Sequence, residues 1–315
     1  MRGREEGADF WAWRDAMLSE AGRLTPATVR ELYTRTYREL LAAGYTAVGE
    51  FHYVGFDEAL AASEAARDAG IEFVCLYVAY ARGGIERFRQ PSVDAYLAQI
   101  DRLRSAGVRV GVAPHSVRAC PREWLQAIGA FARAEGIVLH VHADEQPREI
   151  DECLAEHGVR PIELLAETGC LTERTTIVHG THASDGELDL LAGAGSKICA
   201  CPTTEANLGD GYVPVERIAQ RGIGVCIGSD SNVRIDPLEE LRELEGIARR
   251  TALRRNVIPP AMLLEWGAGE GAAALGLATW PEIEIDLGHP ALAGVPADEL
   301  EAALVFGCGA EVVRG

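Results

Sequence analysis

The sequence predicts an α/β fold in which a parallel sheet curls into a TIM-type (β/α)8 barrel, and three observations support this prediction. The chain has 315 residues, of which 48% are apolar, so it can build one large core. Short β-rich runs alternate with longer amphipathic patterns, as in parallel sheets covered by helices. Ionisable residues follow nearly every predicted strand, and a barrel gathers all its strand ends at one active-site face.

Seven strands are predicted from short apolar runs. They span residues 46–54, 73–80, 109–115, 138–145, 175–182, 197–204 and 224–230. A doubly wound sheet could also use seven strands, but it would place its chemistry at a single switch point. An eight-stranded barrel needs one more strand before residue 46. Residues 10–17 are typical of a loop or short helix, so the predicted barrel lacks its first strand.

Amphipathic patterns between the strands predict the covering helices. They include residues 29–43, 57–69, 92–106, 122–135, 186–194 and 237–250. The last of these helices begins well, because Asp236 can cap it and Pro237 suits its first turn. A helix over 259–277 completes a barrel domain of residues 1–280. Residues 281–315 are too few for an independent domain, so we predict a packed tail.

Charge and cysteine content restrict the environment of the protein. A formal net charge of −18 argues against binding to nucleic acid or to an anionic membrane, since both require basic surface. No apolar run approaches the roughly 18 to 20 residues that span a bilayer, and the N-terminus lacks the apolar core of a signal peptide. The eight cysteines are expected to be small buried hydrophobes, which favours a reducing, cytoplasmic location.

The fourth predicted strand carries the first candidate functional residues. His140 and His142 share one strand face, which points inward in a barrel, and Glu145 follows at the strand end. A neutral imidazole can bind a divalent transition metal, and a nearby carboxylate can move protons to and from metal-bound water. A pair of hydrogen-bonded interior histidines is the alternative interpretation.

Two later strand ends extend this pattern. His179 closes the fifth strand, where it could bind metal or hydrogen-bond the attacking hydroxide, whereas His182 is expected to be structural. Asp230 ends the last strand and could bind metal or accept a proton; a turn that caps the next helix is the alternative. Together with His142, these positions match one metal centre spread over a barrel face.

Two arginines point to the class of substrate. His115 and Arg118 follow the third strand, and a guanidinium group is a planar fork suited to a carboxylate. Arg14, beside two tryptophans, is a second candidate. Ordinary surface salt bridges are the alternative for both arginines. If both face the site, the substrate is a small acidic molecule.

The motifs resemble the amidohydrolase superfamily and, within it, the formimidoylglutamate deiminase branch. The matching stretches are FWAWRD (10–15), EFHYV (50–54), PHSVRA (114–119), HVHADEQ (140–146), VHGTH (178–182), CPTTEANLGDG (201–211), GSDSNVRIDPLEE (228–240) and HPALAGVP (289–296). They follow the family order over nearly the whole chain. CPTTEANLGDG and SDSNVRI together are specific to this branch.

The resemblance implies one zinc ion and the hydrolysis of N-formimidoyl-L-glutamate to N-formyl-L-glutamate and ammonia, a step of histidine degradation. It implies that His142 and Asp230 are metal ligands and that Glu145 is the proton shuttle. His179 would orient the attacking hydroxide or stabilise the tetrahedral intermediate. The residues that would bind the glutamate part of the substrate are Arg14, Tyr53, His115 and Arg118.

The chain departs from the family pattern at both ends. The family carries a His-x-His pair on its first strand, and the sequence begins after that point, as it would from a truncated or misplaced gene start. Residues 281–315 would be a remnant of an accessory β-sandwich. We therefore expect a weakly held metal, unpaired sheet edges and low or no activity for the 315-residue chain. Such edges, and the habit of the family, are compatible with a homodimer.

Two other functions remain open from the sequence. A nucleobase or triazine deaminase, or a chlorohydrolase, could use the same metal barrel, but a neutral heterocycle would not need both Arg14 and Arg118. A non-catalytic barrel that binds a ligand would purify without stoichiometric metal. The sequence does not decide between zinc and another divalent metal.

Overall fold

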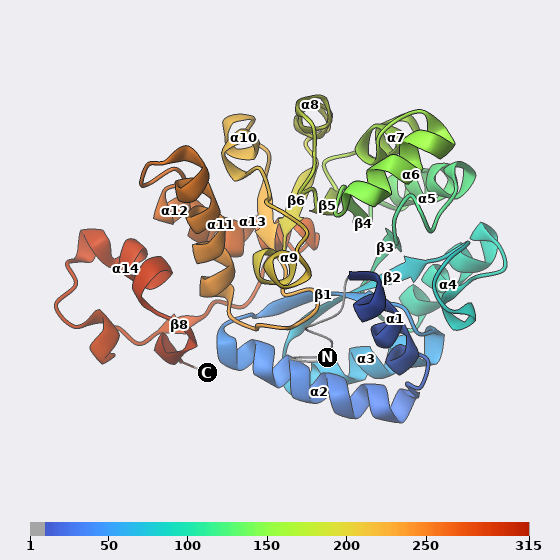
Figure 1. The fold of residues 1–315 in the computed structure, drawn as a ribbon. Coiled ribbons are helices and arrows are strands. Elements are labelled where there is room, and N and C mark those ends of the chain that lie inside the picture. Colours follow the sequence, from blue (N-terminus) through green and yellow to red (C-terminus); the bar gives the residue numbers. More distant parts are fainter. Residues whose placement is uncertain (1–9, 315) are drawn as a thin grey trace.

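The computed structural model describes residues 10–314, and side chains from residue 16 onwards. Its centre is a seven-stranded sheet in which every neighbouring pair of strands is parallel (Figure 1). In sequence and sheet order the strands are β1 (Ala47–His52), β2 (Glu72–Ala79), β3 (Val110–Pro114), β4 (Leu139–Ala143), β5 (Thr175–His179), β6 (Lys197–Ala200) and β7 (Val225–Ile227). This arrangement confirms the prediction of an α/β fold of the TIM-barrel type.

Helices surround the curled sheet (Figure 1). They are α1 (Phe10–Ala21), α2 (Pro26–Ala43), α3 (Phe56–Ala69), α4 (Val93–Ser105), α5 (Arg122–Glu135), α6 (Pro147–His157), α7 (Pro161–Glu167), α8 (Asp185–Ala194), α9 (Pro202–Leu208), α10 (Val215–Gln220), α11 (Pro237–Ala252), α12 (Pro260–Gly267), α13 (Gly269–Ala274) and α14 (Leu300–Gly307). Several begin at strong caps: the Asp236 side chain accepts hydrogen bonds from the backbone N–H groups of Leu238 and Glu239 at 3.0 and 3.1 Å.

Residues 10–17 belong to helix α1, in agreement with the predicted loop or short helix. Two other elements differ from their predictions. The predicted sixth strand ends at Ala200, because Pro202 cannot donate to a strand ladder and instead begins α9. The predicted helix over 259–277 is two helices, α12 and α13, which meet at Ala268 where the backbone turns to φ −113° and ψ −84°.

The inner strands form the centre of the core. All residues of β3, β4 and β5 are buried, as expected for parallel strands covered on both faces. In contrast, β1 is only partly buried along most of its length. Within the described residues β1 and β7 are the two edges of the sheet, which explains the difference. The eight cysteines are free thiols, and all except Cys199 are buried.

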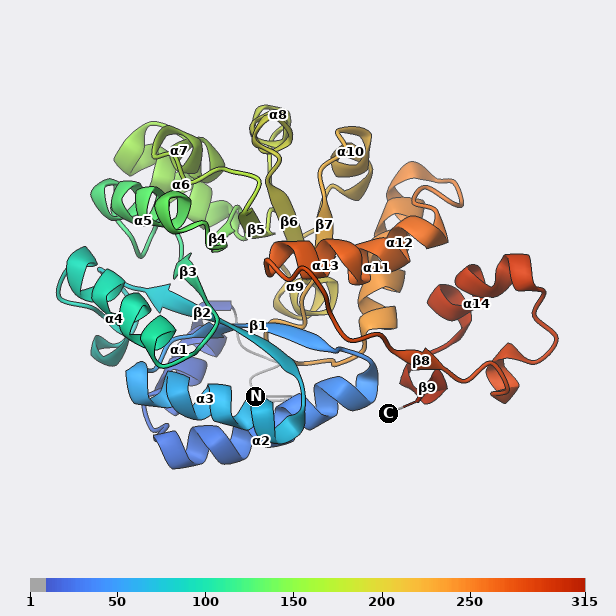
Figure 2. The same ribbon diagram turned by 180° about the vertical axis from the view of Figure 1, so that it is seen from behind.

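The C-terminal segment packs against the outside of the barrel and is largely helical. Seen from behind, it runs from α13 through β8 (Glu284–Ile285) to α14 and returns to β9 (Val313–Arg314), which pairs antiparallel with β8 (Figure 2). Leu292, Cys308 and Val312 form a small apolar cluster with Leu238 of α11. The short 3-10 helices of the chain are η1 (Glu86–Phe88), η2 (Pro290–Leu292), η3 (Ala297–Glu299) and η4 (Ala310–Val312).

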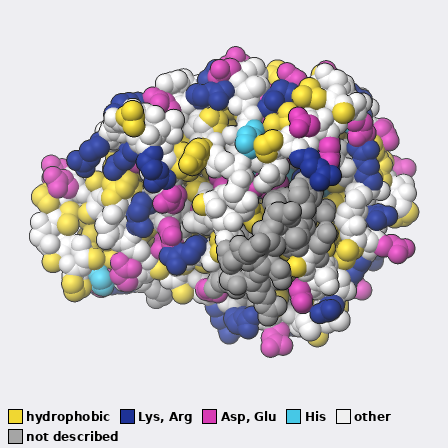
Figure 3. Space-filling view, in the orientation of Figure 1, with side chains coloured by type: hydrophobic (Ala, Val, Ile, Leu, Met, Phe, Trp, Pro, Cys, Tyr) yellow, Lys and Arg dark blue, Asp and Glu magenta, His cyan; other side chains and the backbone are white. Residues whose placement is uncertain are grey.

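Charged side chains of both signs are interspersed over the face shown in Figure 3. Many are paired across neighbouring helices; Arg30 of α2, for example, lies 2.8 Å from both Glu64 and Asp68 of α3. Among the described residues, no helix combines the length and apolar character that a membrane span requires.

Candidate metal centre and active site

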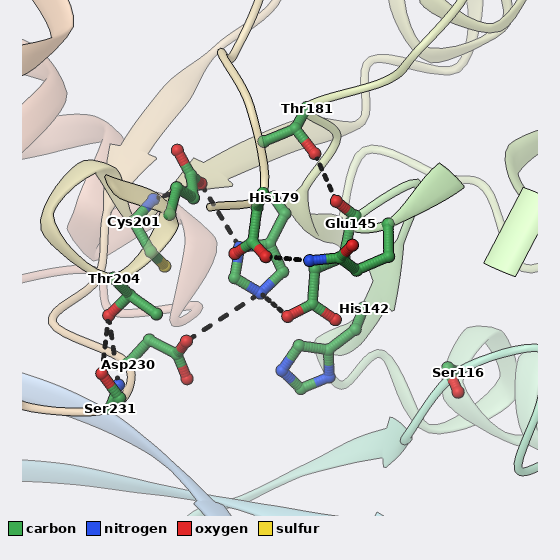
Figure 4. A network of polar contacts seen from close by, with 12 residues as sticks. Ser116, His142, Glu145, His179, Thr181, Cys201, Thr204, Asp230 and Ser231 are labelled. Carbon is green, nitrogen blue, oxygen red and sulfur yellow. Dashed lines mark hydrogen bonds and ion pairs between the residues drawn. The ribbon is translucent and has the colours of Figure 1, made fainter. Parts of the chain in front are cut away.

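The carboxyl ends of β4, β5 and β7 bring the predicted site residues together. His142 lies on β4, Glu145 just after it, His179 at the end of β5 and Asp230 after β7 (Figure 4). The backbone is unusual here: Asp144, His179 and Asp230 have positive φ angles of 54°, 74° and 37°. Left-handed conformations in residues other than glycine are strained and cluster at functional sites. The rim of the sheet therefore has both the chemistry and the strain of an active site.

His179 lies at the centre of this group and is fully buried. Its Nδ1 lies 3.3 Å from Glu205 Oε1, which orients the ring as a donor on that side. Its Nε2 faces Glu145 Oε1 at 3.6 Å and Asp230 Oδ2 at 4.0 Å, and it has no hydrogen-bond partner (Figure 4). Although burial opposes the charged form, Glu145, Glu205 and Asp230 raise the pKa of His179 well above 6.5.

His142 is a neutral imidazole held in one tautomer. Its Nδ1 donates to the backbone carbonyl of His115 at 3.0 Å, so its Nε2 keeps a free lone pair. Burial, with a contribution from His179, lowers the pKa of His142 to about 4. Its ring stacks 4.9 Å from that of His115 and lies 5.5 Å from that of His179. A neutral ring with an available Nε2 is suited to binding metal.

The other histidines have structural contacts. His140 Nε2 donates to the carbonyl of Ala274 in α13 at 2.8 Å, so the interior hydrogen-bond interpretation holds for this member of the pair. His182 Nε2 donates to the carbonyl of Asp210 at 2.6 Å. His52, also at a strand end, bonds to the Gly55 carbonyl at 3.0 Å and lies outside the group around His179.

The two carboxylates beside His179 differ in environment. Burial, followed by the nearby charge of Glu145, raises the pKa of Asp230 to about 6, even though 31% of its side-chain surface remains exposed. Glu145 is more enclosed, with 10% of its side-chain surface exposed. The hydroxyl of Thr181 donates to the Glu145 carbonyl at 2.8 Å and fixes the loop that carries it.

Three of the predicted substrate-binding residues adjoin this group. The His115 ring lies 5.9 Å from that of Tyr53. The ring of Tyr80 also packs beside His115, and the ring of Phe88 packs beside Tyr53. Arg118 Nη2 lies 3.8 Å from Glu145 Oε2, and its Nε lies 3.7 Å from Glu149 Oε1. Arg118 therefore lies beside Glu145, and 17% of its side-chain surface is exposed. The side chain of Arg14 lies outside those that the structure describes.

The structure adds acidic residues to which the sequence assigned no role. Glu149 is fully buried and accepts a hydrogen bond from the Glu145 backbone N–H at 3.2 Å. Glu205 and Asp210 are each 1% exposed and come from the stretch CPTTEANLGDG. In the sequence, their place in a branch-specific motif was the only sign that Glu205 and Asp210 have a role. Their side chains turn toward His179 only because the chain forms α9.

The donor atoms of the site fit a divalent metal ion. Among the described residues, ligand atoms within 4.8 Å of one another form two groups: His179 with Cys201 and Glu205, and His179 with Glu145 and Asp210. His179 Nε2 is buried without a hydrogen-bond partner and could bind an ion once the ring is neutral. Imidazole nitrogen and carboxylate oxygen are the donors that zinc and related ions bind. His179 is common to both groups, and neither group includes His142 or Asp230, the ligands that the resemblance implies.

Known proteins resemble the chain in sequence. The sequence profile of the Amidohydrolase family matches residues 1–280. The chain is 35% identical to formimidoylglutamate deiminase from Pseudomonas aeruginosa over 97% of its own length and 76% of that enzyme. It is 28% identical to 5-methylthioadenosine/S-adenosylhomocysteine deaminase from Haloarcula marismortui over 97% of its own length and 72% of that enzyme.

Solved structures share the fold. An amidohydrolase from Brucella melitensis superposes with a TM-score of 0.88 at 30% identity, covering 100% of this chain and 79% of the other. A zinc-bound adenosine deaminase from Xanthomonas campestris superposes with a TM-score of 0.89 at 21% identity, covering 99% of this chain and 74% of the other. The second likeness bears on the fold alone.

Proposed function

Because the chain belongs to the amidohydrolase family, we propose that it hydrolyses the amidine group of N-formimidoyl-L-glutamate to give N-formyl-L-glutamate and ammonia. The observation that carries this proposal is the position of Arg118, whose guanidinium lies 3.8 Å from Glu145, the acid that faces His179. A cation at that place can hold a carboxylate of the substrate within reach of the reacting groups. The similarity to the Pseudomonas aeruginosa deiminase supports the same substrate.

The chemistry is divided among residues with different surroundings. A divalent metal, which we take to be zinc held by His142 and Asp230 with His179 as a further candidate, would activate the attacking water when bound. Glu145 lies where it can take a proton from that water and deliver it to the departing nitrogen. If it does not itself bind the metal, His179, held through Nδ1 by Glu205, would use Nε2 to orient the attacking oxygen.

The glutamate part of the substrate would lie on the side of β3. Arg118 would bind one carboxylate, while His115 and Tyr53 form an aromatic wall next to His142. Arg14 is proposed as a second carboxylate-binding residue from the sequence motif. A substrate with two carboxylates and one amidine matches a site that offers both an arginine and acidic residues.

The first test is calorimetric binding of N-formyl-L-glutamate to the 315-residue protein, which does not depend on the low turnover expected from the sequence. Ammonia release from N-formimidoyl-L-glutamate is the second. Replacing Glu145 with Gln should lower kcat by about 100-fold or more, the range for losing a general acid–base group. Arg118→Ala should weaken product binding by about tenfold or more. Asp189→Asn, on the exposed face of α8, is the control. A wild-type protein that neither binds nor hydrolyses these compounds would contradict the proposal.

Deamination of an adenine nucleoside is a second candidate, because several relatives carry the name 5-methylthioadenosine/S-adenosylhomocysteine deaminase. The same ammonia assay with 5'-methylthioadenosine tests it. A neutral nucleoside does not need the Arg118 guanidinium, so Arg118→Ala would leave its turnover nearly unchanged. Loss of activity toward the amidine alone in that variant favours the deiminase.

A further inference from the structure

Asp210 is a buried acid that forms no salt bridge among the described residues. It is 1% exposed; its Oδ1 accepts a hydrogen bond from the side-chain amide of Gln146, and its Oδ2 has no hydrogen-bond partner. The backbone on both sides is fixed, because the Asp210 N–H donates to the Glu205 carbonyl at 2.9 Å and the Asp210 carbonyl accepts from His182 at 2.6 Å. The carboxylate is therefore held in place while one of its oxygens remains available.

This carboxylate lies at the reacting centre. Its ligand oxygen and those of Glu145 and His179 all lie within 4.8 Å of one another. Burial, followed by the charge of Glu145, raises the pKa of Asp210 to about 8. The charge of His179 opposes this shift without cancelling it, so a cationic group placed beside Asp210 would stabilise its charged form.

The side chains around His179 also carry more negative than positive charge. The carboxylates that surround it come from Glu145, Glu205, Asp210 and Asp230. Together with the charged His179, a divalent ion would offset three of these four negative charges and leave the one that Asp210 carries when it is ionised. Arg118 contributes little more, because Glu149 also lies within 3.7 Å of it. The remaining charge favours a ligand that brings a positive group to this place.

The proposed substrate carries such a group. Amidines are strong bases that are protonated at neutral pH, with planar N–H donors, whereas the formyl amide of the product is neutral and presents a carbonyl oxygen. We propose that Asp210 receives the cationic amidine nitrogen of the substrate and makes the site selective for a charged amidine over the neutral amide. This role rests on the proposed function. It gives a reason why a buried carboxylate is held in a fixed position by Gln146.

The test uses two ligands of the same shape that differ by one charge. N-carbamimidoyl-L-glutamate carries a cationic guanidine, and N-carbamoyl-L-glutamate carries a neutral urea. We expect the wild-type protein to bind the cationic ligand more tightly by about 10- to 100-fold, the range for a buried charge-assisted hydrogen bond. In Asp210→Asn this preference should disappear, with the dissociation constant of the neutral ligand and the metal content unchanged. Asp210→Glu should retain the preference.

Each other outcome overturns the role of Asp210. A wild-type protein without preference would do so whether or not the variant folds. Equal weakening of both ligands in Asp210→Asn would show that the residue only ties the loop, and lost metal would show that it is a metal ligand. These results are distinct from failure of the proposed function, in which the wild type would neither bind the two ligands nor hydrolyse N-formimidoyl-L-glutamate.

Discussion

At the scale of single residues, hydrogen bonds orient each functional group and leave one of its atoms for a ligand. His142 is fixed through Nδ1 by a backbone carbonyl, and His179 is fixed through Nδ1 by Glu205. Asp210 is held in the same manner by Gln146. The remaining polar atoms of His179, Glu205 and Asp210 are buried and have no hydrogen-bond partners. Such preorganisation costs stability, because the unpaired atoms are removed from water before any ligand is bound.

Glu240, away from the reacting centre, shows the cost of burying a carboxyl group. It gives a prediction for the pH dependence of stability. It is fully buried, and burial raises its pKa from 4.5 to about 8, although hydrogen bonds from Thr203 oppose the shift. Between these two pH values the folded protein holds a proton that the unfolded chain has lost. The contribution of Glu240 to the free energy of unfolding is therefore full below about pH 4.5 and decreases as pH rises toward 8.

We therefore expect Glu240→Gln to lose less stability than the wild type between pH 5 and pH 8, by on the order of 1 to 3 kcal/mol. Urea unfolding at several pH values measures this, and the difference between the two proteins removes the effect of other buried acids. Glu243→Gln, on an exposed face of α11, should follow the wild-type curve. Parallel curves for wild type and Glu240→Gln would contradict the prediction.

At the scale of the elements, the sequence predicts those that have regular periodicity and clear ends. The helix predicted over 122–135 is α5, which ends at Gly136 in the left-handed conformation at φ 63°. The buried strands β3 to β5 likewise begin within a residue or two of their predictions, because continuous apolar runs indicate parallel strands. For the same reason His142, Glu145, His179 and Asp230 could be placed at one rim from the sequence.

Short elements that depend on tertiary contacts could not be predicted. Helix α9 has seven residues and begins with Pro-Thr-Thr, a sequence of low helix propensity. It is stabilised by Glu205, whose Oε1 accepts from the Cys201 backbone N–H at 2.9 Å and from His179, and by Thr203, which bonds to Glu240 of α11. Asp210 lies just beyond this helix, so its position in the site also depends on these tertiary contacts and could not be predicted from the sequence.

The start of α11 gives a prediction at this scale, since this helix follows the loop that carries Asp230. Asp236 accepts two backbone hydrogen bonds there, so Asp236→Ala should lower the free energy of unfolding by about 1 kcal/mol, the usual value of an N-cap. Asp236→Asn retains the acceptor oxygen and serves as the matched control in chemical denaturation. Equal losses in the two variants would show that charge, and not capping, is responsible.

At the scale of the whole molecule, the site exists only when distant parts of the sheet come together. His142, His179 and Asp230 come from β4, β5 and the loop after β7, and helices hold each of these strands in place from outside. A ligand that bridges these elements therefore links several parts of the fold. The open edges β1 and β7 make such a link more important, because no ladder joins them within the described residues.

Metal should accordingly stabilise the whole chain. At a zinc concentration about 100 times the dissociation constant, binding adds roughly 2.7 kcal/mol to the free energy of unfolding and should raise Tm by about 3 to 8 °C relative to chelator-treated protein. Differential scanning calorimetry measures this shift without requiring turnover. Asp230→Ala is the informative variant, because its side chain is partly exposed and its loss should remove most of the shift without disrupting the core. His289→Gln, in the C-terminal segment, should retain the shift. An equal shift in wild type and Asp230→Ala would show that zinc binds elsewhere, and the metal centre at this rim would have to be abandoned.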